Sequence, residues 1–148
     1  MVYIGIDPGK KGGYAIIDDV HHTVEAYPWD DMEFVRKMVE YSECGMSVMV
    51  CVEKVNSMPG QGLVSTFSFG KAAGFIEGVL TACGLSYQLV SPRVWKKSYG
   101  LDSSKQKSID VCQRLFPDVN LLATERSRVP SDGKAESLLL AMFAKRHF

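Results

Sequence analysis

The stretch Ile4-Gly5-Ile6-Asp7-Pro8-Gly9 is the part of the sequence on which the predicted fold depends. The apolar run that leads up to Asp7 predicts a strand buried on both faces. An ionised carboxylate at its end is costly unless it is paired or binds a cation. Pro8-Gly9 and then Gly12-Gly13 predict a turn into a second strand over 14–17 that returns beside the first. An acid at this place suits a metal or phosphate ligand, although an Asx-turn before Pro-Gly explains Asp7 equally well.

The remaining strands and helices are predicted from periodicity and from helix start and stop signals. Strands are expected over 22–27, 46–52 and 85–90. Helices are expected between Asp30 and Gly45, over 66–83, briefly over 93–97, from Ser103 or Ser104 to Phe116, and from about Asp132 onward. Three antiparallel strands followed by strand–helix units predict an α/β fold, a mixed five-stranded sheet with helices on both faces. This order resembles the ribonuclease H-like fold, here as a single domain over 1–148.

Composition sets the class of protein and the expected compartment. A chain of 148 residues with 46% apolar side chains is typical of one globular domain. No apolar run approaches the roughly 20 residues of a membrane span, and no basic segment precedes the first strand, so neither a membrane partner nor a signal peptide is expected. The four scattered cysteines contain no CxxC motif and favour reduced thiols over a zinc site. The expected location is cytoplasmic, or the cytoplasm of an infected host if the chain is phage-encoded, or an organelle after removal of a targeting segment.

The charge is zero overall but unevenly distributed. A balanced charge argues mildly against nucleic acid, because non-specific DNA binders are usually basic. The segment 93–107 is nevertheless basic, with only Asp102 against Arg93, Lys96, Lys97, Lys105 and Lys107. We predict that these residues follow a phosphate backbone, the alternative being a solvated helix face.

Two features of the helix over 66–83 bear on its partners. Gly70-Lys71 suggests a P-loop, but Ser65 stands where the first glycine should be and Ala72 follows the lysine, so no nucleotide triphosphate is expected. One helical face is stripped of side chains, at Gly70, Gly74, Gly78 and Ala82. This glycine ridge predicts close packing, against either a partner subunit or the helix's own sheet.

Three further carboxylates accompany Asp7. Glu53 ends a second buried strand, and Asp132 and Glu136 share one face of the last helix. Taken alone, Asp132 is a plausible N-cap and Glu136 a solvated side chain. In the predicted topology the four acids converge at one edge of the sheet, where they would repel one another without cations. Such oxygen ligands suit two ions of Mg²⁺, or of Mn²⁺ as a substitute, which can clamp an in-line phosphodiester displacement.

These motifs together identify a resemblance to the RuvC-type Holliday junction resolvases, and most closely to their phage-encoded and chloroplast branch. It covers nearly the whole chain, through 4–9 with Gly12-Gly13, Val52-Glu53-Lys54, the glycine-rich helix to Gly84, Ser91-Pro92-Arg93-Val94-Trp95-Lys96 and 132–141. In bacterial members the last acidic pair is usually spaced by three residues and ends in Asp. This sequence departs from that pattern and agrees with the chloroplast-like branch.

The resemblance implies a Mg²⁺-dependent, homodimeric endonuclease that makes paired nicks in four-way DNA junctions. It implies that Asp7 bridges both metals, that Glu53 holds one ion, and that Asp132 and Glu136 hold the other. Catalytic assistance is expected from Lys105, with Lys96 also near the scissile phosphate. DNA contacts are expected from Lys54, Asn56, Met58, Gln61, Lys71, Arg93, Lys96 and Lys97. The loop over 56–62 would enter the junction centre and read bases.

Other classes of protein share parts of this pattern. Another ribonuclease H-like nuclease or recombinase domain would carry similar acids, and only substrate tests separate it from a resolvase. A sugar-kinase or actin-type ATPase shares the first hairpin but needs two such domains. A non-catalytic junction-binding module would be favoured if one of the four acids were missing, and none is.

Overall fold

The fold is built on a mixed five-stranded sheet with strand order β3-β2-β1-β4-β5. The structure, a computed structural model, describes residues 1–56, 60 and 62–148. The strands are β1 (Val2–Asp7), β2 (Gly13–Asp18), β3 (Thr23–Pro28), β4 (Val48–Glu53) and β5 (Ser86–Val90). The first three strands are antiparallel, and β4 and β5 extend the sheet in parallel with β1. The predicted sheet is therefore confirmed, with β1 at its centre.

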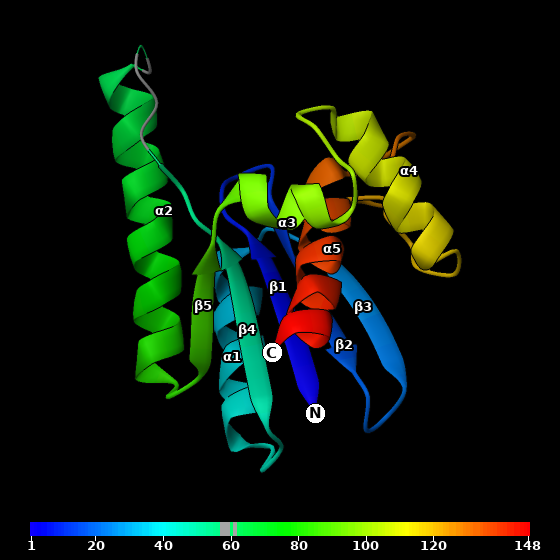
Figure 1. Ribbon diagram of the computed structural model, residues 1–148. Coiled ribbons are helices and arrows are strands. Elements are labelled where there is room, and N and C mark those ends of the chain that lie inside the picture. The colour runs from blue at the N-terminus through cyan, green and yellow to red at the C-terminus, as the bar shows by residue number, and fades with distance from the viewer. Residues whose placement is uncertain (57–59, 61) are drawn as a thin grey trace.

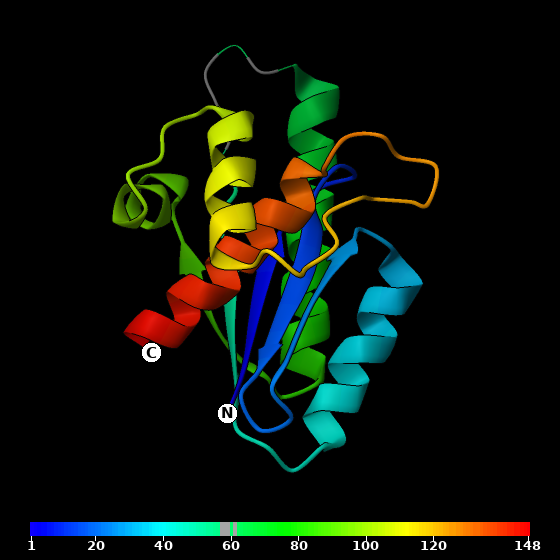
Figure 2. The ribbon, with the colours of Figure 1, turned by 90° about the vertical axis from the view of Figure 1, so that its right-hand side faces the viewer.

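Helices cover both faces of this sheet, as predicted (Figure 1). They are α1 (Asp31–Glu43), α2 (Leu63–Ala82), α3 (Pro92–Ser98), α4 (Lys105–Leu115) and α5 (Asp132–His147). Figures 1 and 2 place α1 and α2 on one face and α5 across the other, with α3 and α4 beside α5. Helix α2 begins at Leu63 rather than at the predicted Thr66, because Leu63, Val64 and Ser65 add one turn at its start, after the N-cap Gly62.

The close approach of α5 to β1 depends on a glycine. A Cβ atom at Gly5 would lie 2.0 Å from the Ser137 carbonyl oxygen and 2.2 Å from the Ala141 nitrogen. The backbones of β1 and α5 are therefore in direct contact, and Leu138, Leu139 and Leu140 are fully buried around that contact. This packing fixes α5 over the centre of the sheet.

A second glycine contact holds the start of α5 against the β1–β2 turn. A Cβ atom at Gly133 would lie 2.3 Å from the carbonyl oxygen of Lys11. Because Asp7 precedes that turn and Asp132 precedes Gly133, this contact brings two of the four predicted acids to the same end of the sheet.

The glycine ridge of α2 does not face the sheet. A Cβ atom added at Gly70, Gly74 or Gly78 meets no atom of the described residues within 4 Å. Of the two expected uses of this ridge, packing against its own sheet is therefore wrong: α2 contacts the core through Ile76 and Leu80 on a different face. The ridge is free to approach another molecule.

Helix α2 is also more apolar than the sequence reasoning allows. Among the described residues, Leu63–Ala82 is the one helix that is long and apolar enough to cross a membrane, and little of it is buried. The expectation that no apolar run approaches this length is therefore wrong. Composition of this kind is weak evidence for a membrane, and it equally marks a helix that needs a covering partner.

Candidate active site

Four carboxylates lie at one end of the sheet. Asp7 and Glu53 end the neighbouring parallel strands β1 and β4, and Asp132 and Glu136 lie in the first turns of α5. The N-cap of α5 is Ser131, whose hydroxyl accepts from the Lys134 N–H, so the interpretation of Asp132 as a cap is wrong. The sequence prediction that these acids converge is supported by their mutual electrostatic effects.

The strongest of those effects falls on Asp7. Desolvation raises the pKa of its carboxyl well above the usual value, and the charges of Glu53, Glu136 and Asp132 raise it further, opposed by Lys96. Asp7 is thus the point on which the other three carboxylates act. A raised pKa means that the ionised carboxylate of Asp7 is destabilised unless a bound cation neutralises its charge.

Glu53 is held by a residue from α3. The indole Nε1 of the fully buried Trp95 donates a hydrogen bond of 2.7 Å to Glu53 Oε2. Burial raises the pKa of the Glu53 carboxyl, and this hydrogen bond opposes the rise because it stabilises the ionised form. Trp95 therefore fixes the orientation of one candidate metal ligand.

Glu136 and Asp132 are held by residues from α3 and α4. Glu136 is only 7% exposed, so the alternative of a solvated side chain is wrong. Its Oε1 accepts from Lys96 Nζ at 2.8 Å and from the Ser108 hydroxyl at 2.9 Å. Lys105 Nζ lies 2.6 Å from Asp132 Oδ2, and that contact raises the pKa of Lys105. Two ammonium groups thus balance part of the negative charge.

The four carboxylates fit a hard divalent cation, both because their ligand atoms are oxygens and because some of those oxygens have no protein partner among the described residues. In the described part of the chain, Glu53, Asp132 and Glu136 each have one carboxylate oxygen that forms a hydrogen bond or ion pair with the protein. The other oxygen of each carboxylate has no protein hydrogen bond. That pattern suits one-oxygen ligation of Mg²⁺. As the side chains stand, no three His, Cys, Asp or Glu residues among those described are close enough to hold one ion together. Ligation therefore needs movement of these side chains toward Asp7.

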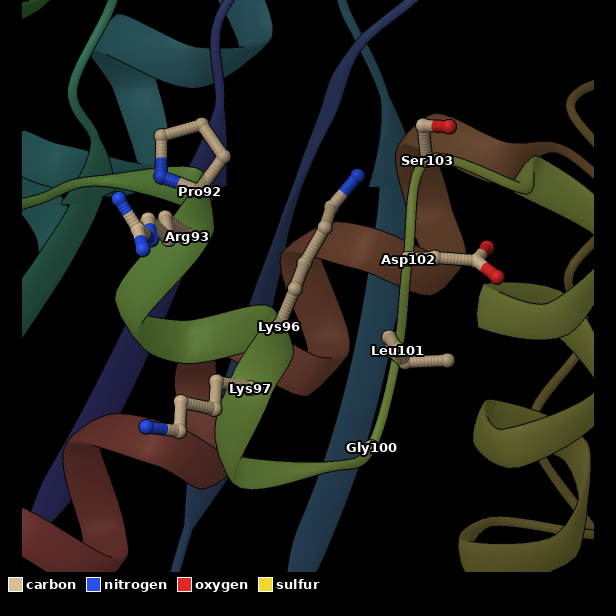
Figure 3. Close-up of a pocket in the computed structure, with 8 residues that line it drawn as sticks. All are labelled: Pro92, Arg93, Lys96, Lys97, Gly100, Leu101, Asp102 and Ser103. Atoms are coloured by element: carbon tan, nitrogen blue, oxygen red, sulfur yellow. The ribbon is translucent and has the colours of Figure 1, made fainter.

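The predicted DNA-binding residues that the structure describes lie on α3, directly after β4, and on α2. Arg93, Lys96 and Lys97 project from α3 beside a pocket of about 530 Å³ that is closed on the other side by residues 100–103 (Figure 3). Lys54 and Asn56 are exposed directly after β4.

Two of the remaining DNA-binding residues cannot be placed, and one lies apart. Lys71 is exposed on α2, on the other face of the sheet from α5, and is not brought together with the α3 group (Figure 1). Met58 and Gln61 lie outside the described residues.

Sequence reasoning misses two positioning residues. Trp95 stands in the sequence only as part of a family motif, and Ser108 only as part of a helix. Trp95 is 42 positions from Glu53, and Ser108 is 28 positions from Glu136. No local pattern links such positions. The available signal is a tryptophan next to Lys96 in the short helix that follows β5, the strand beside β4.

We expect Trp95→Phe to weaken metal binding by about tenfold to 100-fold, because ligand-orienting hydrogen bonds contribute effects of this size. Titration calorimetry with Mn²⁺ in the absence of DNA measures the change. Trp29→Phe is the matched control, since Trp29 donates to the exposed Asp31 and not to a candidate ligand. Equal Mn²⁺ affinity in Trp95→Phe and wild type would show that the indole does not position Glu53.

Comparisons with known proteins bear on the fold. No family model matches the chain, and no curated protein sequence matches it. Among solved structures, the chain is similar to Thermus thermophilus RuvC in complex with a Holliday junction substrate, with a TM-score of 0.61 and 16% identity over 99% of this chain and 96% of that one. A second Thermus thermophilus RuvC structure gives a TM-score of 0.56 at 17% identity over 96% and 92%.

These likenesses confirm the fold that the sequence resemblance implied. The protein is an α/β protein with the RuvC, ribonuclease H-like arrangement over almost its whole length. The finer placement in the phage and chloroplast branch stays a prediction.

Proposed function

We propose that the protein is a Holliday junction resolvase, a structure-selective endonuclease that makes paired nicks in four-way DNA junctions. The observation that carries the proposal is the placement of Asp7, Glu53, Asp132 and Glu136 at one end of a RuvC-like sheet. Support for the DNA partner comes from the similar Thermus thermophilus protein, which is solved with a Holliday junction substrate.

The proposed chemistry is metal-assisted hydrolysis of a phosphodiester. Asp7 would hold both of two Mg²⁺ ions, Glu53 one of them, and Asp132 with Glu136 the other. When bound, the ions would supply an activated water and stabilise the leaving oxygen. Trp95 and Ser108 keep the carboxylate oxygens oriented.

Lys96 and Lys105 form ion pairs with two of the candidate ligands. Their ammonium groups contact Glu136 and Asp132 at 2.8 and 2.6 Å, so both lie beside any phosphate bound there. We propose that Lys105 assists catalysis by stabilising negative charge on that phosphate and that Lys96 binds the same strand. Arg93 and Lys97 extend this contact along α3.

The dimer is proposed from the exposed surface of α2. A junction has approximate two-fold symmetry, and two symmetric nicks from one active site per chain imply a C2 homodimer. The open glycine ridge and the exposed Leu63, Val64 and Phe67, at 90%, 82% and 75%, provide a surface that needs cover.

Gly74→Leu is expected to remain folded and become monomeric. A Cβ atom at Gly74 meets no atom of the described residues within 4 Å, but a leucine side chain there would obstruct a helix packed on the ridge. Sedimentation velocity and circular dichroism measure the two properties. Gly74→Ala is the control and should stay dimeric if alanine is tolerated at the contact. A Gly74→Leu variant that is still dimeric would place the dimer interface elsewhere.

A panel of labelled substrates tests the proposed selectivity. The protein is incubated with a four-way junction, a duplex, a flap and an RNA–DNA hybrid, with and without Mg²⁺. The proposal expects cleavage of the junction alone and only with the metal. Preferred cleavage of the hybrid or flap would indicate another ribonuclease H-like nuclease, and junction binding without cleavage would indicate a non-catalytic module.

A further inference from the structure

A second group of cations borders the candidate active site, on segments outside the basic stretch 93–107. Lys10 and Lys11 lie in the β1–β2 turn, three and four positions after Asp7. Arg126 and Arg128 lie in the loop over 122–131, which leads directly into Asp132. We call these four residues the turn–loop surface. Along the chain, the turn follows Asp7 and the loop leads into Asp132.

Both segments are anchored to the start of α5. The turn meets α5 at the Gly133 contact, where a Cβ atom would lie 2.3 Å from the Lys11 carbonyl oxygen. The loop is closed by a bridge between Leu122 and Pro130 and by a 2.7 Å hydrogen bond from the Ser131 N–H to the Leu121 carbonyl oxygen. The turn–loop surface therefore stands on a defined scaffold.

A lysine inside the fold strengthens that anchoring. Lys134 is 5% exposed, and its Nζ donates a 3.0 Å hydrogen bond to the Leu122 carbonyl oxygen. Burial lowers the pKa of Lys134, and the side chain holds the loop instead of contributing to the surface. Thr124 and Ser127 add hydrogen bonds within the loop.

The turn–loop surface and α3 lie on different sides of the start of α5. In Figure 2 the loop extends to one side of α5, near the β1–β2 turn, and α3 lies on the other side. Figure 1 also separates α3 from the loop, which there lies behind α4. The segments that carry the two groups of basic residues thus lie on two sides of the start of α5.

The charge of the turn–loop surface is less neutralised than that of the α3–α4 group. On α3 and α4, Lys96, Lys105 and Lys107 are each paired with a carboxylate. Within the part of the chain that the structure describes, no acid lies within ion-pair distance of any of the four turn–loop cations. All four are exposed, and Glu125 is the one acid in the loop. Exposed, unpaired cations are the ones that release counterions when they meet phosphates.

We propose that the turn–loop surface binds backbone phosphates of the DNA substrate, on the side of the carboxylates away from α3. A strand that crosses the active site is then held on both sides of the scissile phosphate. This inference rests on the proposed function for the identity of the ligand as DNA, but it concerns binding and needs no cleavage step.

The test measures binding of labelled four-way junction and duplex DNA by fluorescence anisotropy in EDTA, over a series of salt concentrations. The variants are K10Q/K11Q and R126Q/R128Q, each of which removes two positive charges. The matched control is R36Q/K37Q on α1, where Arg36 and Lys37 pair with Glu33 and Glu40 on the other face of the sheet.

Each turn–loop variant is expected to flatten the slope of log K against log salt by about 1–2 units, at roughly 0.9 for each phosphate that is no longer neutralised, and the control by none. Slopes equal to wild type in both turn–loop variants, or an equal flattening in the control, would overturn the inference. A wild-type protein that binds with the expected slopes but does not cut junctions would refute the proposed function and leave this surface standing. Normal junction cleavage by wild type, together with unchanged slopes in the turn–loop variants, would support the proposed function and refute the role of this surface.

Discussion

Asp7→Asn is expected to slow junction cleavage at least about 1,000-fold while junction affinity changes little. Asp7 is the carboxylate on which the charges of Glu53, Glu136 and Asp132 all act, so its loss removes the position proposed to share both ions. Loss of several kcal/mol of transition-state stabilisation corresponds to a rate effect of this size. Single-turnover cleavage with saturating enzyme measures the rate, and anisotropy in EDTA measures the affinity.

Stability against pH is the control that separates lost chemistry from lost folding. The pKa of Asp7 is raised in the folded protein, so its ionisation favours the unfolded state. Metal-free wild type should therefore lose stability as pH rises above the ordinary Asp pKa toward the folded value, and Asp7→Asn should lose less. Thermal melts across that pH range should show the variant at least as stable as wild type at neutral pH. A variant that is both inactive and unfolded would leave the catalytic role unsupported.

Gly5→Ala is expected to cause a large loss of stability. The new Cβ atom would lie 2.0 Å from the Ser137 carbonyl oxygen and 2.2 Å from the Ala141 nitrogen, so α5 must move off β1. Overpacking of a core costs about 1–3 kcal/mol and occasionally more, and a contact with backbone cannot be relieved by a change of rotamer. Denaturant unfolding measures the cost.

Gly74→Ala is the matched control for that measurement. It adds the same methyl group where no atom of the residues that the structure describes lies within 4 Å, and alanine improves helix propensity by about 1 kcal/mol. Its unfolding free energy should equal or exceed that of wild type. Equal stability of Gly5→Ala and wild type would contradict the direct contact of α5 with β1, and with it the placement of Asp132 and Glu136 beside Asp7.

Most of the fold can be predicted from the sequence because its signals are local. The period-two and continuous apolar runs predict the five strands, and Asp30 caps α1 by accepting from the Glu33 N–H at 2.8 Å, as its position suggests. The four acids stand out because each ends a strand or begins the last helix, and topology fixes where those ends meet.

The remainder depends on three-dimensional contacts that no spacing encodes. The sequence leaves the direction of the glycine ridge open, because a helix stripped of side chains can approach either a sheet or a partner. Trp95 and Ser108 act on acids far away in sequence. Lys10, Lys11, Arg126 and Arg128 do not stand out, because the one basic cluster visible along the sequence lies between 93 and 107.

Product analysis on a mobile four-way junction shows whether the protein resolves junctions by paired, symmetric nicks. The junction carries a different 5′ label on each of two opposed strands, and the reaction is started with Mg²⁺ and then treated with DNA ligase. We expect both opposed strands to be cut at symmetric positions within one bound complex, and ligase to seal the products into two intact duplexes. Single unpaired nicks, cuts at unrelated positions, or undiminished cleavage in EDTA would contradict it.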